Sequence, residues 1–217
     1  MQRRTFLAGI SLVALGAGLW LARPDRAPLM AALAEGSGET DAPMVQEMAL
    51  GSADAPVTVL EYASVTCPQC AAFHKTVFPQ IKANYIDTGK VRFVYREVYF
   101  DRFGLWAGMV ARCGGEGRYF GIVELIYDRQ RDWAAGNDPA RIAANLRTLG
   151  KVAGLGDAEL DACMSDGEKA QAMVDTWESN RQRDGIDSTP SFVIDGQKYG
   201  NMSYADFARI LDAKLGG

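Results

Sequence analysis

The segment VTVLEYASVTCPQC, residues 57–70, decides the fold of this chain. Its first part, Val57–Tyr62, is β-branched and apolar, which predicts a buried strand. Apolar residues then recur at helical spacing from Cys67 to about Tyr85, which predicts a helix, and Pro79 predicts a kink inside it. The segment therefore places two cysteines where a strand gives way to a helix.

Cys67 and Cys70 carry the chemistry of this segment. A spacing of three residues puts both sulfurs on one helical face, close enough to form a disulfide. Pro68 suits the first helical position, where its missing N–H costs nothing. Free N–H groups and the helix dipole at this end favour a thiolate. We expect Cys67 to be the reactive cysteine, with a pKa lowered moderately and mainly by the helix N-terminus, and Cys70 to be buried and to act second.

The alternative is a stable disulfide between these two cysteines, or half of a metal site. A disulfide that closes so small a loop would restrict the unfolded chain little. The sequence holds no second Cys-x-x-Cys pair to complete a zinc site. Redox chemistry is therefore the favoured reading of the pair.

Further along the chain, the pattern continues as strand, helices, hairpin and helix. Residues 91–98 alternate with period two and predict a second strand, and a long helical block follows. Residues 191–199 predict a hairpin whose type I′ turn is Asp195-Gly196. An amphipathic helix from Tyr204 to Leu215 ends the chain. This order describes an α/β domain with helices packed on a small sheet.

The composition excludes several classes of protein. A chain of 217 residues predicts one domain, and 48% hydrophobic residues are enough to fill its core. The net charge of −4 disfavours a nucleic-acid partner. Four cysteines are too few for a disulfide scaffold, and one histidine with a single close pair of cysteines falls short of the usual four-ligand pattern of a structural zinc site.

The N-terminal sequence predicts an export signal or a membrane anchor. Residues 1–34 combine a basic start with a long apolar run, as an export signal or a membrane anchor does. Arg3-Arg4-Thr5-Phe6-Leu7 resembles a twin-arginine signal, although a plain secretion signal explains it too. Either cleavage follows Ala32-Leu33-Ala34, which leaves a soluble periplasmic protein, or residues 5–22 tether it to the inner membrane. Residues 35–43 are small and polar and predict a linker, so we place the folded domain at 44–217.

Together these motifs resemble the DsbA-type thiol:disulfide oxidoreductases of the thioredoxin superfamily. The resemblance rests on the strand, Glu61 six residues before Cys67, the Cys67–Cys70 pair, the helical block and Thr189-Pro190 before a strand. It implies an α/β thioredoxin fold with a helical insertion at about 101–186. It also implies a cis Pro190 that shapes a substrate groove with Thr189, and a buried Glu61 that exchanges protons with the second cysteine.

Several of these residues have a second interpretation. Thr189-Pro190 could form an ordinary trans turn, since cis accounts for only ~5–6% of X–Pro bonds. Glu61 could simply pair with a nearby base, but an acid within an apolar strand usually has a functional reason. His74 is expected on a solvated helix face. Gln69 stands where the family often has His, so Pro68 and Gln69 are the expected tuning positions.

Cys113 and Cys163 lie in the helical block, outside the family's minimal pattern. An even number of cysteines in an exported chain predicts that these two form a structural disulfide. The alternative is two buried free thiols.

The function we expect is an exported oxidoreductase that donates the Cys67–Cys70 disulfide to reduced exported proteins. The resemblance implies reoxidation by a membrane partner of the quinone-linked DsbB type, and we expect no metal, organic cofactor or nucleic acid. One alternative is the same fold acting as a reductase or isomerase. Another is a periplasmic chaperone or a copper carrier, although no Met or His cluster surrounds Cys67.

Overall fold

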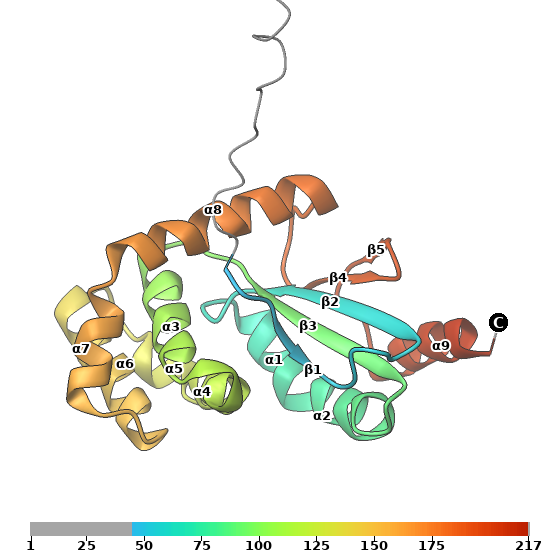
Figure 1. The fold of residues 1–217 in the computed structure, drawn as a ribbon, viewed down its shortest axis with the longest axis horizontal. Coiled ribbons are helices and arrows are strands. Elements are labelled where there is room, and N and C mark those ends of the chain that lie inside the picture. Colours follow the sequence, from blue (N-terminus) through green and yellow to red (C-terminus); the bar gives the residue numbers. More distant parts are fainter. Residues whose placement is uncertain (1–44, 217) are drawn as a thin grey trace, which may run out of the picture. The chain divides into compact units, whose positions relative to one another are not determined.

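A five-stranded sheet forms the centre of the structure, a computed structural model that describes residues 45–216 (Figure 1). The strands are β1 (Met48–Leu50), β2 (Val57–Ala63), β3 (Val91–Glu97), β4 (Ser191–Ile194) and β5 (Gln197–Tyr199), in the order β1-β3-β2-β4-β5. Only β2 and β3 run parallel, and the other neighbours are antiparallel. The central strand β2 therefore has hydrogen-bonded partners on both sides.

Helices cover the sheet on both faces and extend beyond one end of it (Figure 1). They are α1 (Pro68–Thr76), α2 (Phe78–Ile81), the π-helical turn η1 (Lys82–Ile86), α3 (Arg102–Cys113), α4 (Gly115–Asp128), α5 (Gln130–Trp133), α6 (Pro139–Val152), α7 (Asp157–Met164), α8 (Gly167–Asp184) and α9 (Tyr204–Leu215). The six helices α3 to α8 all lie between β3 and β4 in the sequence.

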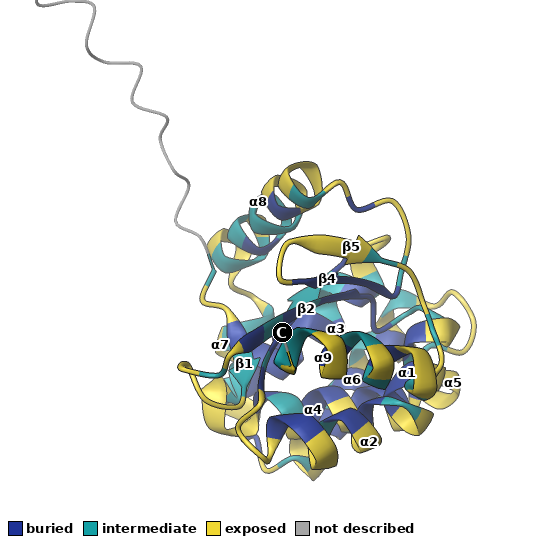
Figure 2. Cartoon of the chain, turned by 90° about the vertical axis from the view of Figure 1, so that its right-hand side faces the viewer, coloured by how far each residue is buried: buried dark blue, intermediate teal, exposed yellow. Residues whose placement is uncertain are grey.

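Two apolar layers sandwich the sheet. Phe73 of α1 and Phe207 of α9 pack with Phe192 of β4 in a buried cluster on one face. Trp177 of α8 packs against Tyr62 of β2 in a smaller cluster. Figure 2 shows the buried residues concentrated in the strands and on the inner sides of the helices. The predicted α/β arrangement is confirmed.

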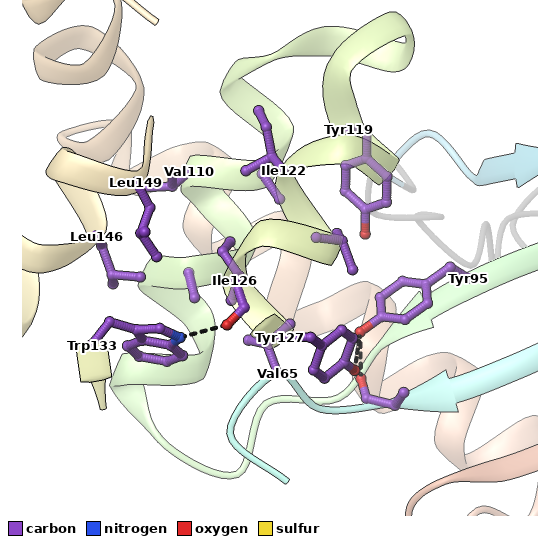
Figure 3. Packing of buried hydrophobic residues seen from close by; sticks show 14 of the residues in the cluster. Val65, Tyr95, Val110, Tyr119, Ile122, Ile126, Tyr127, Trp133, Leu146 and Leu149 are labelled. Atoms are coloured by element: carbon purple, nitrogen blue, oxygen red, sulfur yellow. Dashed lines mark hydrogen bonds between the residues drawn. The ribbon is translucent and has the colours of Figure 1, made fainter. Parts of the chain in front are cut away.

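The helical block has its own core, which reaches the sheet through aromatic side chains. Trp133 donates a hydrogen bond from its indole N–H to the carbonyl oxygen of Ile126 at 2.9 Å, among buried Leu and Ile side chains (Figure 3). Arg112 of α3 donates two hydrogen bonds of 2.7 Å to the carboxylate of Glu97 in β3. This buried ion pair fixes the block to the sheet.

The helix after Cys67 differs from its prediction. It ends at Thr76, and a new short helix starts at Phe78, so the break precedes Pro79 instead of lying at it. Proline cannot donate the hydrogen bond that would join Pro79 to the turn before it, and its ring crowds that turn. The break therefore falls in the turn that Pro79 disrupts.

The end of the chain follows the prediction closely. Asp195 and Gly196 have φ angles of 44° and 81°, as a type I′ turn requires, and they join β4 to β5. The closing helix α9 has the predicted bounds. Strand β1 was not predicted, because three residues are too short to show a period.

The predicted export segment, 1–34, and the predicted linker, 35–43, lie outside the described residues. Within residues 45–216 no helix has both the length and the apolar character needed to cross a bilayer.

Candidate functional site

The cysteine pair lies where β2 ends and α1 begins. Cys67 is the N-cap residue of α1 and Pro68 is its first helical residue. The backbone N–H of Cys67 donates to the carbonyl oxygen of Ser64 at 3.0 Å, which closes the turn after the strand. Cys67 is half-buried, whereas Cys70 is completely buried, and both are free thiols. Only the first sulfur is open to a reaction partner.

The two cysteines differ sharply in acidity. A hydrogen bond from the Cys70 thiol is the main reason why the pKa of Cys67 falls to about 5. Hydrogen bonds from Thr189 and from the backbone N–H groups of Cys70 and Gln69 lower it further, against the effect of burial. The same bond to Cys67, burial and the charge of Glu61 raise the pKa of Cys70. Cys67 is therefore a thiolate at neutral pH beside a protonated Cys70.

This result corrects the expectation of a moderate shift caused mainly by the helix N-terminus. The backbone N–H groups of α1 do contribute, but the Cys70 thiol contributes more. Gln69, a predicted tuning residue, acts here through its backbone N–H, and its side chain is exposed.

The loop before β4 faces the reactive sulfur. The Thr189–Pro190 peptide bond is cis, and Pro190 is buried. The carbonyl oxygen of Thr189 lies 3.6 Å from the Sγ of Cys67. Lys198 of β5 donates to the carbonyl oxygen of Gly185 at 2.6 Å and fixes the start of this loop. The structure thus brings Thr189 and Pro190 together with the cysteine pair, although 122 residues separate Thr189 from Cys67.

Glu61 and His74 form a buried pair inside the domain. Glu61 lies in the middle of β2 and is 0% exposed, and His74 is 7% exposed. The Nε2 atom of His74 lies 3.1 and 2.9 Å from the two carboxylate oxygens of Glu61. The expectation of a solvated His74 is therefore wrong. His74 shares its helix face with Cys70 and Phe73, and that face packs on the sheet.

Cys113 and Cys163 are joined by a disulfide that links α3 to α7, with their Cα atoms 5.8 Å apart. This bond lies in the helical block, away from the reactive pair in the sequence. It ties together two helices that are 50 residues apart.

Sequence reasoning missed Gln130, which connects the helical block to the active turn. Its Nε2 atom donates to the carbonyl oxygens of Val65 and Cys67 at 2.8 and 3.1 Å. It also missed the bond of 2.7 Å between the hydroxyls of Tyr95 and Tyr127 (Figure 3). No local pattern identifies such contacts, because each joins elements that are distant in the sequence.

No group of three or more His, Cys, Asp or Glu side chains within residues 45–216 is arranged to hold a metal ion. The described site presents a low-pKa thiolate at Cys67, a buried thiol at Cys70 and a buried acid at Glu61.

Known proteins share this arrangement of sequence and fold. A sequence profile described as thioredoxin matches residues 44–213. Disulfide bond formation protein D of Bacillus subtilis is 45% identical over 179 residues, which cover 77% of each chain. A protein of Rickettsia bellii named as a protein-disulfide oxidoreductase is 32% identical over 170 residues, or 78% of this chain. The chain spans 64% of the length of that rickettsial relative.

Among solved structures, alpha-DsbA1 of Wolbachia pipientis matches with a TM-score of 0.73 and 27% identity, over 80% of this chain and 93% of the other. This match confirms the predicted thioredoxin fold with added helices. The family profile, the relatives and the reactive pair at the start of α1 agree, and the chain belongs to the thioredoxin family as a DsbA-type member.

Proposed function

We propose that this protein is a thiol:disulfide oxidoreductase that donates the Cys67–Cys70 disulfide to reduced, newly exported proteins. The observation that carries the proposal is the low pKa of the half-exposed Cys67, about 5, beside the buried Cys70 thiol. A stabilised thiolate exists only in the reduced enzyme. It therefore makes the disulfide form a strong oxidant.

Disulfide donation proceeds in two exchange steps. A substrate thiolate attacks the Sγ of Cys67, the Cys67–Cys70 bond breaks, and Cys70 leaves and takes up a proton. A second substrate thiolate then attacks the substrate sulfur of the mixed disulfide and expels Cys67 as a thiolate. Its low pKa makes Cys67 a good leaving group in this second step.

The position of the loop at Thr189 and Pro190 supports a role for these two residues in binding substrate beside Cys67. Its carbonyl group lies beside the Cys67 sulfur, where the backbone of an extended substrate segment would run. A buried proline offers no N–H there, so nothing from that residue competes with the substrate for hydrogen bonds.

The proposal also includes the cellular compartment in which the protein acts and the partner that reoxidises it. The apolar N-terminal run predicts export to an oxidising compartment, where disulfides persist. Each turnover leaves a reduced enzyme, which needs an oxidant, and we propose a membrane quinone-linked partner of the DsbB type.

The reduction potential of the Cys67–Cys70 couple tests this proposal. We expect equilibration with glutathione buffers to give a potential above about −180 mV. A value near that of thioredoxin, about −270 mV, would make the protein a reductase. The measurement should use the variant in which Cys113 and Cys163 are both serine, so that the second disulfide does not contribute to the measured equilibrium.

A further inference from the structure

A hollow of about 330 Å³ opens beside the loop that faces the reactive sulfur. Thr189 lines this hollow, and its carbonyl oxygen lies 3.6 Å from the Sγ of Cys67. The volume lies at the lower end of the range of ~300–1,000 Å³ that is usual for ligand sites. We call it the Trp177 hollow, and its lining includes Val98, Phe100, Trp177, Arg181 and Ile186.

The direction of the strands explains why this hollow adjoins the site. Strands β2 and β3 run parallel, so both leave the sheet at the same end. There β2 leads to Cys67, and β3 leads to Val98 and Phe100. The backbone N–H of Val98 donates to the carbonyl oxygen of Ala63 at 2.9 Å, which keeps the two segments side by side. Open α/β sheets bind ligands at this end, beyond the carboxyl ends of parallel strands.

The Trp177 hollow has a buried apolar lining and an exposed apolar rim. Val98 and Ile186 are 1% and 3% exposed, and Trp177 of α8 packs against them. Phe100, by contrast, is 61% exposed. A large apolar side chain bound here would leave water and would cover Phe100 at the same time, and both changes favour binding.

Arg181 of α8 adds a positive charge at the edge of the hollow. It is exposed, and it forms no ion pair with any residue in the described part of the chain, whereas its neighbour Arg183 pairs with Asp184 at 3.0 Å. Asp187 also lines the hollow, but its charge is balanced by Lys198 at 2.8 Å. The uncompensated charge at this edge is therefore positive and attracts an acidic group.

We propose that the Trp177 hollow binds a large apolar side chain of the substrate, within two residues of the cysteine that attacks Cys67, and that Arg181 binds an acidic side chain next to it. Thr189 borders both the Cys67 sulfur and the hollow, and an extended chain advances only ~3.3 Å per residue, so the bound side chain belongs to a near neighbour of the substrate cysteine.

This preference selects segments that have not yet folded, because folded proteins bury most of their large apolar side chains. The proposal rests on the disulfide-donating function given above and adds the class of segment that the protein oxidises fastest.

A second hollow, of about 400 Å³, borders the cysteine pair through Pro68. Its lining carries charges of both signs, from Lys75, Asp128 and Arg131. Its charges therefore favour no single class of side chain. Arg131 is exposed and lines this second hollow, which makes it a matched control for Arg181.

Oxidation of short peptides with one cysteine tests the proposal. A peptide thiolate attacks the Sγ of Cys67 and releases Cys70, which takes up a proton. A second peptide thiolate then attacks the bound peptide sulfur and releases Cys67, which leaves a peptide disulfide and the reduced enzyme.

Each peptide has Phe at one of the four positions within two residues of the cysteine, or Ala at all four. The next residue away from the cysteine is either Glu or Lys. Each rate is divided by the rate at which the same peptide reduces oxidised glutathione, because a neighbouring charge also changes the pKa of the peptide thiol.

We expect the wild-type enzyme to oxidise the best Phe peptide about 10-fold faster than the Ala peptide. At low salt its Glu form should react about fivefold faster than its Lys form, as expected for an exposed ion pair. Phe100→Ala should reduce the preference for Phe to about twofold or less, and Arg181→Gln should remove the preference for Glu. Two control variants at exposed positions, Val152→Ala and Arg131→Gln, should retain both preferences.

Equal corrected rates for the Phe and Ala peptides in the wild type would overturn the proposal, as would a preference for Phe that Phe100→Ala leaves unchanged. A preference for Glu that falls as far in Arg131→Gln as in Arg181→Gln would refute the role of Arg181. All these outcomes leave disulfide donation intact. A wild-type enzyme that oxidises none of the peptides would instead refute the proposed function.

Discussion

Gln130 of the helical block donates a hydrogen bond of 3.1 Å to the carbonyl oxygen of Cys67, the reactive residue at the start of α1. The same Nε2 atom donates to Val65 at 2.8 Å, so one side chain holds both sides of the turn that carries Cys67. The inserted helices therefore do more than cover the sheet, because they fix the geometry of the reactive sulfur.

Replacing Gln130 by leucine should loosen this turn. We expect a loss of about 1–3 kcal/mol in the free energy of unfolding, because two carbonyl groups lose a buried partner. The pKa of Cys67 should rise, because a looser turn weakens the hydrogen bond from Cys70 that lowers it. Urea unfolding and thiolate absorbance against pH measure the two effects.

Gln80→Leu is the matched control, since Gln80 also donates to a backbone carbonyl, that of Thr76 at 2.7 Å, but on the exposed side of α2. Equal effects of the two substitutions on the pKa of Cys67 would show that Gln130 has no special role.

The pH dependence of the reduction potential follows from the acidity of Cys67. Above about pH 5 reduction takes up one proton, on Cys70, and below it takes up two, so the slope should change from about 30 to about 59 mV per pH unit. The pKa of Cys67 in the folded protein lies below its value of ~8.5 in the unfolded chain. The Cys67 thiolate therefore stabilises the reduced, folded protein fully above about pH 8.5, and this stabilisation is lost as the pH falls through about 5. One uniform slope from about pH 4 to pH 8 would contradict the assigned pKa.

Gln69→His should make the enzyme a stronger oxidant. A partly positive ring beside the helix N-terminus would stabilise the Cys67 thiolate, which exists only in the reduced form. Each unit by which the pKa falls should raise the potential by about 30 mV. Thiolate titration and glutathione equilibration of both proteins measure the two changes. An unchanged or higher pKa would mean that this position does not tune the reaction.

Much of the fold could be predicted because its signals are local. The strand before Cys67, the hairpin turn at Asp195 and the last helix all show in short-range periodicity or turn residues. The burial of His74 could not be read in the same way, since a helix position becomes buried only when a sheet packs on it. Yet Glu61 within an apolar strand signals that a buried partner must exist, and His74 shares the helix face of Cys70. The contacts of Gln130 arise only from tertiary packing, which no local signal reports.

The disulfide between Cys113 and Cys163 should stabilise the helical block. Replacing both by serine should lower the free energy of unfolding by up to about 4 kcal/mol, the value that the chain-entropy model gives for a loop of this size. Urea unfolding of both proteins measures the difference, which should vanish when a strong reductant opens the bond in the wild type. Equal stability under oxidising conditions would show that the bond adds nothing.

The transfer of a disulfide to a reduced, unfolded protein tests the central claim most directly. Oxidised enzyme should lose its Cys67–Cys70 bond as the substrate loses two thiols, and Cys67→Ser should abolish the transfer. Cys70→Ser should accumulate a covalent adduct with the substrate, because Cys67 is the half-exposed sulfur and no second cysteine can release it. A covalent adduct that forms with Cys67→Ser but not with Cys70→Ser would contradict the assigned roles, and substrate thiols left unchanged by the oxidised wild-type enzyme would contradict disulfide donation itself.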